Sequence, residues 1–434
     1  MFLWTKIISE FFLIKQSIFA RNIIKVASGN ALSYVIPFVL SPIIARLFPP
    51  TSFGEVALYS TTAAFVTGIG TLKYESAIQL PKEEKDAVNL LGLSFIILTT
   101  ISLISLVSIL VFNSSLIRTL GIESISKWFY FIPLSIFVGG TYAILNVWTS
   151  RSKKFGRMAI YNIANTAITS TVKIVLGLAN YSIGGLIAGT LIGQFISKGL
   201  YVLNVYKKDN IDLSLINTVD LKRVAIKYKD FPIFLNSQQL LGRIKETGII
   251  YLITIYYSTE ILGLYSLTIG ALSIPIYTIG TAVSNVYFQK ASEMVKNNQD
   301  LWALTKKMIV RQFILGIMLF MPVLLFGPKI YSIFYGEQWF LAGFYAQFIV
   351  FWFIMIFIET GVNKIAIVCK KQKQNFYLNA LFTPIFILLT VVILEMDWEF
   401  SSFLKFVVVY NMIHIFVKLF YWRKWALLIH QIVI

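Results

Sequence analysis

The sequence predicts an all-α polytopic membrane protein with twelve transmembrane helices in two six-helix lobes. Of its 434 residues, 57% are hydrophobic and only 13% are charged, whereas a soluble protein is about 45–50% apolar and about 25% charged. Polar side chains are too few to cover a water-soluble core of this size. The apolar residues also fall into stretches that are each long enough to cross a bilayer.

Twelve stretches of about 20 mostly apolar residues have the length that a membrane-spanning helix needs. Before the first of them, Lys6, Glu10 and Lys15 interrupt the apolar run. We therefore expect a short interfacial helix there rather than a signal peptide. In chain order the stretches are residues 24–46, 54–78, 88–112, 128–149, 158–178, 183–204, 231–255, 261–287, 308–327, 338–366, 375–395 and 401–422.

The basic residues predict the orientation of these stretches. Most of the 38 lysine and arginine residues fall in every second connecting segment, together with both ends of the chain. Because cytoplasmic segments carry the excess of Lys and Arg, both termini are predicted to lie in the cytoplasm. The net charge of +18 reflects this bias and an attraction to anionic lipid headgroups, so it indicates no nucleic-acid partner.

The longest polar stretch divides the chain near its midpoint. Residues 1–206 are predicted to form the N-terminal lobe, 207–230 a cytoplasmic connecting loop, and 231–434 the C-terminal lobe. An Ile-Gly-Thr run at 69–71 recurs at 279–281, which indicates an internal repeat. Two lobes related by an axis along the membrane normal suit a transporter with alternating access.

Ionisable residues inside the apolar stretches are the candidates for a substrate site. At mid-bilayer each costs about 2.5–3.5 kcal/mol unless it faces a partner or a cavity. Arg243, Lys245 and Glu246 lie in the middle of the stretch 231–255. Arg243 and Glu246 share a helix face and can neutralise one another, whereas Lys245 points elsewhere. Two interpretations stay open here: a structural ion pair, or a cationic wall for an anionic substrate.

Three further embedded charges, Lys173, Lys364 and Glu359, extend this hypothesis. Lys173 and Lys364 are expected to line the same cationic cavity, while Glu246 and Glu359 are the candidates for binding a coupling ion, H⁺ or Na⁺. Lys198 is near a predicted cytoplasmic helix end, and we interpret it as reaching the membrane surface. Because basic residues outnumber acidic ones in the stretches, the cavity should attract a diphosphate and repel organic cations.

Polar residues in the last stretch form a stripe along one helix face. Asn411, His414 and Lys418 are spaced i, i+3 and i+7. We expect them to form hydrogen bonds to neighbouring helices, and a proton-titrating role of His414 is the alternative.

Four segments resemble bacterial polysaccharide flippases of the Wzx type. Residues 74–81 match the aromatic-acid-x-Ala-Ile-x-Leu-Pro run that is common in that family. Lys73 stands where an arginine is usual, and Thr268 opens a Thr-Ile-Gly run where relatives often have an arginine. We expect Arg243 or Lys245 to supply that charge. The segments are SGNALSYVIPFVLSPIIARLFPPTSFGEVALYS (28–60), KYESAIQLPKEEKDAVNLLGLS (73–94), YKDFPIFLNSQQLL (228–241) and GLYSLTIGALSIPIYTIGTAVSNVYFQKASE (263–293).

The resemblance implies the MATE-like fold of the multidrug/oligosaccharidyl-lipid/polysaccharide (MOP) exporter superfamily. It also implies a flippase, not an enzyme, acting on an undecaprenyl-diphosphate-linked oligosaccharide, an O-antigen or capsule repeat unit. The expected location is the bacterial inner membrane. A polysaccharide polymerase and a chain-length regulator are the protein partners that the resemblance implies.

Two other function classes make different predictions. A cation or drug antiporter of the same superfamily should have a net acidic cavity. A polysaccharide polymerase or glycosyltransferase should carry a long outer loop or an acidic catalytic pair. Cys369 is the only cysteine, and the sequence contains no phosphate-binding motif of the ATPase type. We therefore expect no cofactor or metal apart from the coupling ion.

Overall fold

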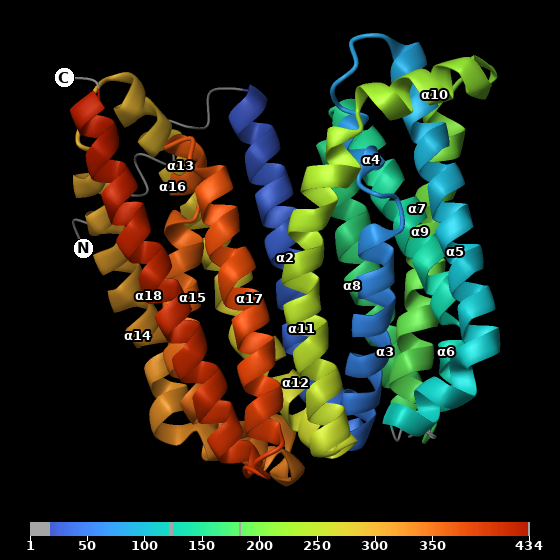
Figure 1. Ribbon diagram of the computed structural model, residues 1–434. Helices are drawn as coiled ribbons and strands as arrows, with labels where there is room; N and C mark the ends of the chain where they lie inside the picture. The colour runs from blue at the N-terminus through green and yellow to red at the C-terminus, as the bar shows by residue number, and fades with distance from the viewer. Residues whose placement is uncertain (1–17, 121–124, 182–183, 433–434) are drawn as a thin grey trace.

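The computed structural model describes residues 18–120, 125–181 and 184–432, and within these ranges the chain forms helices and no strands (Figure 1). Most of the interfacial helix expected before the first span, residues 1–17, lies outside the described residues. The all-α prediction is confirmed for the part of the chain that is described.

In the described part of the first half of the chain, eight helices precede the connecting segment, with α4 and α6 as single turns. Their bounds are α2 (Ile18–Leu47), α3 (Pro50–Ile69), α4 (Tyr74–Ala77), α5 (Glu84–Leu120), α6 (Ser126–Phe129), α7 (Ile132–Arg151), α8 (Phe155–Leu178) and α9 (Gly185–Asp209).

The connecting segment and the second half follow. Their bounds are η3 (Leu213–Leu215), α10 (Thr218–Lys227), η4 (Phe231–Asn236), α11 (Ser237–Tyr256), α12 (Thr259–Pro275), η5 (Ile276–Gly280), α13 (Thr281–Lys296), α14 (Leu301–Tyr335), η6 (Glu337–Trp339), α15 (Phe340–Val362), α16 (Ile365–Val368), α17 (Gln372–Leu394) and α18 (Phe400–Ile432).

Eight helical segments of the described chain are long and apolar enough to cross a membrane, which makes this a multi-pass membrane protein. The predicted stretches 158–178 and 231–255 are also helical, as α8 and as η4 with α11, but are less apolar. The stretch 54–78 is helical as α3 only to Ile69, because a turn with positive φ at Leu72 and Lys73 separates it from α4, and it is also less apolar. In α11 the cause is the charged group Arg243, Lys245 and Glu246. In α2 the residues whose side chains the structure describes form the apolar helix Leu32–Leu47.

At one end of the molecule, α3 and α12 touch backbone to backbone. Gly54 in α3 faces Thr259 at the start of α12, and Gly263 in α12 faces Pro50 at the start of α3. A Cβ on Gly263 would lie 1.7 Å from the Pro50 carbonyl oxygen. Nearby, the indole of Trp339 donates to a carbonyl near the end of α2 (2.8 Å). Helices from the two halves of the chain are therefore held together at this end, which we call the closed end.

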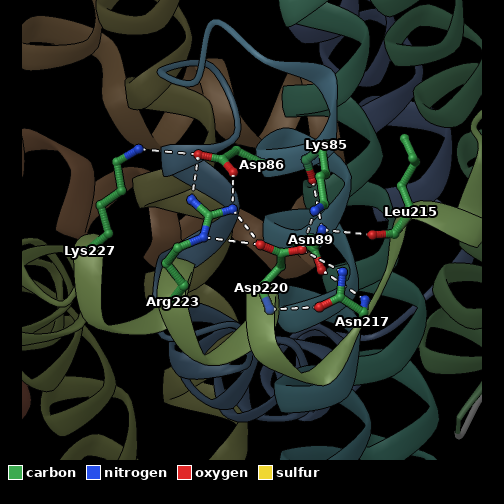
Figure 2. Close-up of polar contacts among 8 residues, drawn as sticks. All are labelled: Lys85, Asp86, Asn89, Leu215, Asn217, Asp220, Arg223 and Lys227. Atoms are coloured by element: carbon green, nitrogen blue, oxygen red, sulfur yellow. Dashed lines mark hydrogen bonds and ion pairs between the residues drawn. The ribbon is translucent and has the colours of Figure 1, made fainter.

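At the opposite end, α10 lies across the ends of the long helices, beside α5 (Figure 1). Ion pairs fix it there (Figure 2). Asp86 of α5 accepts from Arg223 (2.6 Å) and from Lys227 (3.2 Å). Asp220 accepts from the same guanidinium (2.6 Å) and is 2.7 Å from the Lys85 ammonium.

Hydrogen bonds from Lys85, Arg223 and Asn217 hold the pKa of Asp220 well below its usual range, so its carboxylate stays charged at neutral pH. The amide of Asn89 in α5 adds bonds to the Leu215 carbonyl (3.0 Å) and from the Asn217 N–H (3.2 Å). The connecting segment, expected as a loop, is thus a helix docked on the first half.

Candidate functional site

A cavity of about 820 Å³ lies between α3 and the second-half helices α11, α12, α15 and α18. We call it the main chamber. Its walls are apolar and aromatic, with Tyr265, Tyr277 and Trp352 among them. Five charged side chains line it, namely Arg243, Lys245, Glu246, Glu359 and Lys418.

Arg243 reaches from α11 across to α3, in the other half of the chain. Its Nη1 donates to the Ala64 carbonyl (2.7 Å). The guanidinium approaches the backbone closely because residue 68 of α3 is a glycine: a Cβ there would lie 2.4 Å from the Arg243 Nε. This contact replaces the predicted pair with Glu246, since none of the ion pairs between described residues joins these two side chains.

Lys245 and Lys418 each find a polar partner on another second-half helix. The Lys245 ammonium donates to Asn411 Oδ1 of α18 (2.6 Å) and lies 4.7 Å from the centre of the Phe386 ring. Lys418 forms an ion pair with Glu359 of α15. Asn411 and Lys418 therefore make the interhelical hydrogen bonds that the spacing of the stripe predicts. His414 does not: its Nε2 has no hydrogen-bond partner among the described residues, and its ring stacks on Phe382.

Glu246 differs from Glu359, because no hydrogen bond or ion pair among the described residues involves its carboxylate. It lines the main chamber and is exposed there. A carboxylate without a partner, next to basic side chains that already have partners, can take up a proton or a monovalent metal ion.

Two of the four predicted cavity cations, Lys173 and Lys364, do not line the main chamber. Lys173 packs from α8 against α9, where a Cβ on Gly189 would lie 2.6 Å from its Cγ. Lys364 is the residue that precedes α16, beyond the end of α15. The structure thus brings together Arg243 and Lys245 with both candidate acids, and it places Lys173 and Lys364 elsewhere.

A second cavity, of about 250 Å³, lies among first-half helices α3, α7 and α9. We call it the small chamber. Ser60, Ala64 and Arg243 line both chambers, so the chambers meet beside these residues. The other cation in the small chamber is Lys198, whose ammonium donates to Gln194 Oε1 (2.8 Å). Lys198 therefore points inward, and the interpretation that it reaches the membrane surface is wrong.

Comparison with known proteins gives one family. The model of a family described as "Polysaccharide biosynthesis protein" matches residues 43–342. The succinoglycan biosynthesis transport protein ExoT of Rhizobium meliloti (strain 1021) is 24% identical over 314 residues, which are 71% of this chain. The chain spans 60% of the length of that curated relative.

Solved structures show the same fold. An inward-facing MATE-family multidrug resistance transporter of the MOP superfamily superposes with a TM-score of 0.66 at 14% identity, over 93% of this chain and 99% of that one. The eukaryotic MATE transporter AtDTX14 gives a TM-score of 0.59 at 13% identity, over 96% of this chain and 100% of that one. The MATE-like fold implied by the sequence resemblance is confirmed.

Proposed function

Because this chain belongs to the polysaccharide biosynthesis protein family, we propose that it is a flippase for a polyprenyl-diphosphate-linked oligosaccharide. It carries the substrate across a bacterial inner membrane by alternating access, as a transporter and not as an enzyme. The resemblance to Wzx-type flippases, the transport protein among its relatives and the MATE-like fold support this proposal.

The observation that carries the proposal is the charge of the two chambers. Four cations line them, Arg243, Lys245, Lys418 and Lys198, against the two carboxylates Glu246 and Glu359. Such charges are costly inside a bilayer and persist where they serve a ligand or a partner. Guanidinium and ammonium groups bind phosphate oxygens through charge-assisted hydrogen bonds. The positive excess therefore favours a diphosphate over an organic cation.

We infer twelve spans in two lobes of six, counting α2, α3, α8 and α11 with the eight more apolar helices. α4, α10 and α16 lie at the same end of the molecule (Figure 1). The basic residues near these elements support a cytoplasmic location for that end, and we propose that both chain termini are cytoplasmic as well. The closed end then faces outward and must open for the substrate to leave.

The proposal predicts that purified protein in liposomes flips a lipid-linked oligosaccharide, and that the Arg243→Ala/Lys245→Ala variant does not. Loss of two charge-assisted contacts of about 1.5–3 kcal/mol each should slow flipping by more than about a hundredfold. Accessibility of the labelled sugar to an external lectin measures the rate.

The matched control is Lys222→Ala/Lys229→Ala, which removes two exposed cations outside the chambers and should leave flipping unchanged. Full activity of Arg243→Ala/Lys245→Ala would contradict the proposed substrate site. Export of an organic cation without any flipping by the wild-type chain would instead establish the antiporter alternative, for which the unpaired Glu246 and the aromatic walls are the supporting features.

We further propose that Glu246 binds the coupling ion, H⁺ or Na⁺. Glu246→Gln should abolish the acceleration of flipping by an imposed proton or sodium gradient, because a neutral amide can neither bind a proton nor balance a metal ion. Slow flipping without a gradient should remain. Glu293→Gln, which changes an exposed acid in α13, is the control. A Glu246→Gln variant that still responds fully to both gradients would rule out this role.

A further inference from the structure

The two chambers differ in the groups that they offer to a ligand. In the main chamber, Lys418 is paired with Glu359, while Lys245 and Arg243 are each bonded to a neutral oxygen, of Asn411 and of Ala64. Glu246 adds a second negative charge there. The two carboxylates offset two of the three cations, so the main chamber offers less free positive charge than its number of basic residues suggests.

The small chamber has no carboxylate among its lining residues and is rich in hydrogen-bond donors. Of the three N–H donors of Lys198, one bonds Gln194 Oε1, which leaves two on the ammonium, and Gln194 also lines the chamber. Arg243 has five N–H donors, and its Nη1 bond to Ala64 occupies one. Such a set of unused donors without acids suits an anion with several acceptor oxygens.

The cations of the small chamber are held in place by the protein. The Lys198 ammonium lies 5.8 Å from the centre of the Tyr142 ring, in addition to its bond with Gln194. Residue 139 is a glycine, and a Cβ there would lie 3.9 Å from the Lys198 Nζ and 3.1 Å from the Thr67 Cγ2. A larger side chain at position 139 would therefore press against two residues that line the small chamber, Lys198 and Thr67.

Size separates the two chambers in the same way. Pockets for whole small-molecule ligands are about 300–1,000 Å³, and the small chamber is about 250 Å³. It can hold a compact group such as a diphosphate but not an oligosaccharide. The main chamber, of about 820 Å³, has the room and the aromatic walls for sugars.

Resting on the proposed function, we propose that the diphosphate of the substrate binds in the small chamber, between Lys198 of α9 and Arg243 of α11. The sugars then occupy the main chamber. Because Lys198 belongs to the first half of the chain and Arg243 to the second, a bound diphosphate joins the two halves at the point where the chambers meet. Lys198 thereby becomes a substrate-binding residue.

The test is isothermal titration calorimetry, in which inorganic diphosphate is titrated into the purified full-length protein in detergent and the Kd is measured. Lys198→Met should raise the Kd at least about tenfold, as expected for one charge-assisted hydrogen bond. Lys198→Arg, which keeps the charge, should retain binding within a few-fold. Lys208→Met is the matched control, because it removes an exposed lysine from the far end of the same helix and should bind as the wild type does.

Gly139→Leu provides a second test that leaves every charge in place. Its side chain should press on Lys198 and Thr67 in the lining of the small chamber and weaken diphosphate binding as strongly as Lys198→Met does. If Lys198→Met does not give a monodisperse protein, the diphosphate Kd of Gly139→Leu is the measurement that tests the proposal. Wild-type protein that binds no diphosphate, or Lys198→Met and Gly139→Leu variants that bind it with unchanged Kd, would overturn the proposal.

The flipping assay separates this proposal from the function on which it rests. If the protein binds diphosphate through Lys198 but flips no lipid-linked oligosaccharide, the anion site is supported and the flippase function is contradicted. The wild type could also flip the substrate while Lys245→Met loses diphosphate affinity and Lys198→Met keeps it. This result would support the flippase function but assign the diphosphate to the main chamber, which contradicts the proposal made here.

Discussion

Replacement of Glu359 by Gln is expected to destabilise the protein by about 3–5 kcal/mol, because it leaves the ammonium of Lys418 without its counter-charge inside the membrane. Both side chains are mostly buried, with 19% of Glu359 and 10% of Lys418 exposed. The apparent melting temperature of the purified protein in detergent measures the effect. Lys418→Met should be destabilising for the reciprocal reason.

The double variant Glu359→Gln/Lys418→Met is the decisive comparison. When both partners of a buried pair are replaced together, no uncompensated charge remains, so most of the lost stability should return. If the pair is only structural, this variant should also keep gradient-driven flipping, and Glu246 becomes the sole acid available for coupling among the lining residues of the main chamber. Recovery of stability without recovery of gradient-driven flipping would assign Glu359 to the coupling step. Additive losses of stability in the double variant would contradict the ion pair itself.

The sequence predicts that Arg243, Lys245 and Glu246 belong to a site. Three charges in one apolar stretch are energetically costly in the bilayer unless they face a cavity or a partner. The sequence is also informative about Asn411 and Lys418, because helical spacing alone puts them on one face. Their partners could not be predicted. Glu359 is 59 residues from Lys418 along the chain, and only the packing of α15 against α18 joins them.

Lys198 and Lys173 show where reading the sequence fails. Both are single lysines in apolar stretches, and depth in the membrane gives no information on the direction in which a side chain points. The structure turns Lys198 toward α3 and α7, and it packs Lys173 against α9. The same limit applies to α10. Its docking depends on Asp86, which is 137 residues before Arg223 in the chain. Because the sequence does not show this partner, the polar connecting segment is predicted as a loop.

A single methyl group at Gly263 is expected to disrupt the closed end. The Cβ of Gly263→Ala would lie 1.7 Å from the Pro50 carbonyl oxygen and 3.0 Å from the Gly54 nitrogen. Non-bonded atoms prefer about 3.5–4.0 Å, so α3 and α12 have to move apart. Because both obstacles are backbone atoms, no side-chain rotation relieves the clash. Overpacking of this kind costs about 1–3 kcal/mol, more than the roughly 0.5–1 kcal/mol that alanine gains over glycine in a helix.

Gly270→Ala on the same helix is the matched control, since nothing lies within 4 Å of the Cβ that it adds. This variant should be as stable as the wild type or slightly more so, whereas Gly263→Ala should melt at a lower temperature. If closing this end is a step of the transport cycle, a cost of about 1–3 kcal/mol should reduce the closed population about 5–150-fold. Flipping by Gly263→Ala should fall with it, and cysteines introduced at this end should react faster with an impermeant thiol reagent. Equal melting temperatures for the two alanine variants would show that α3 and α12 can separate here without cost, and the closed end could then not act as a gate.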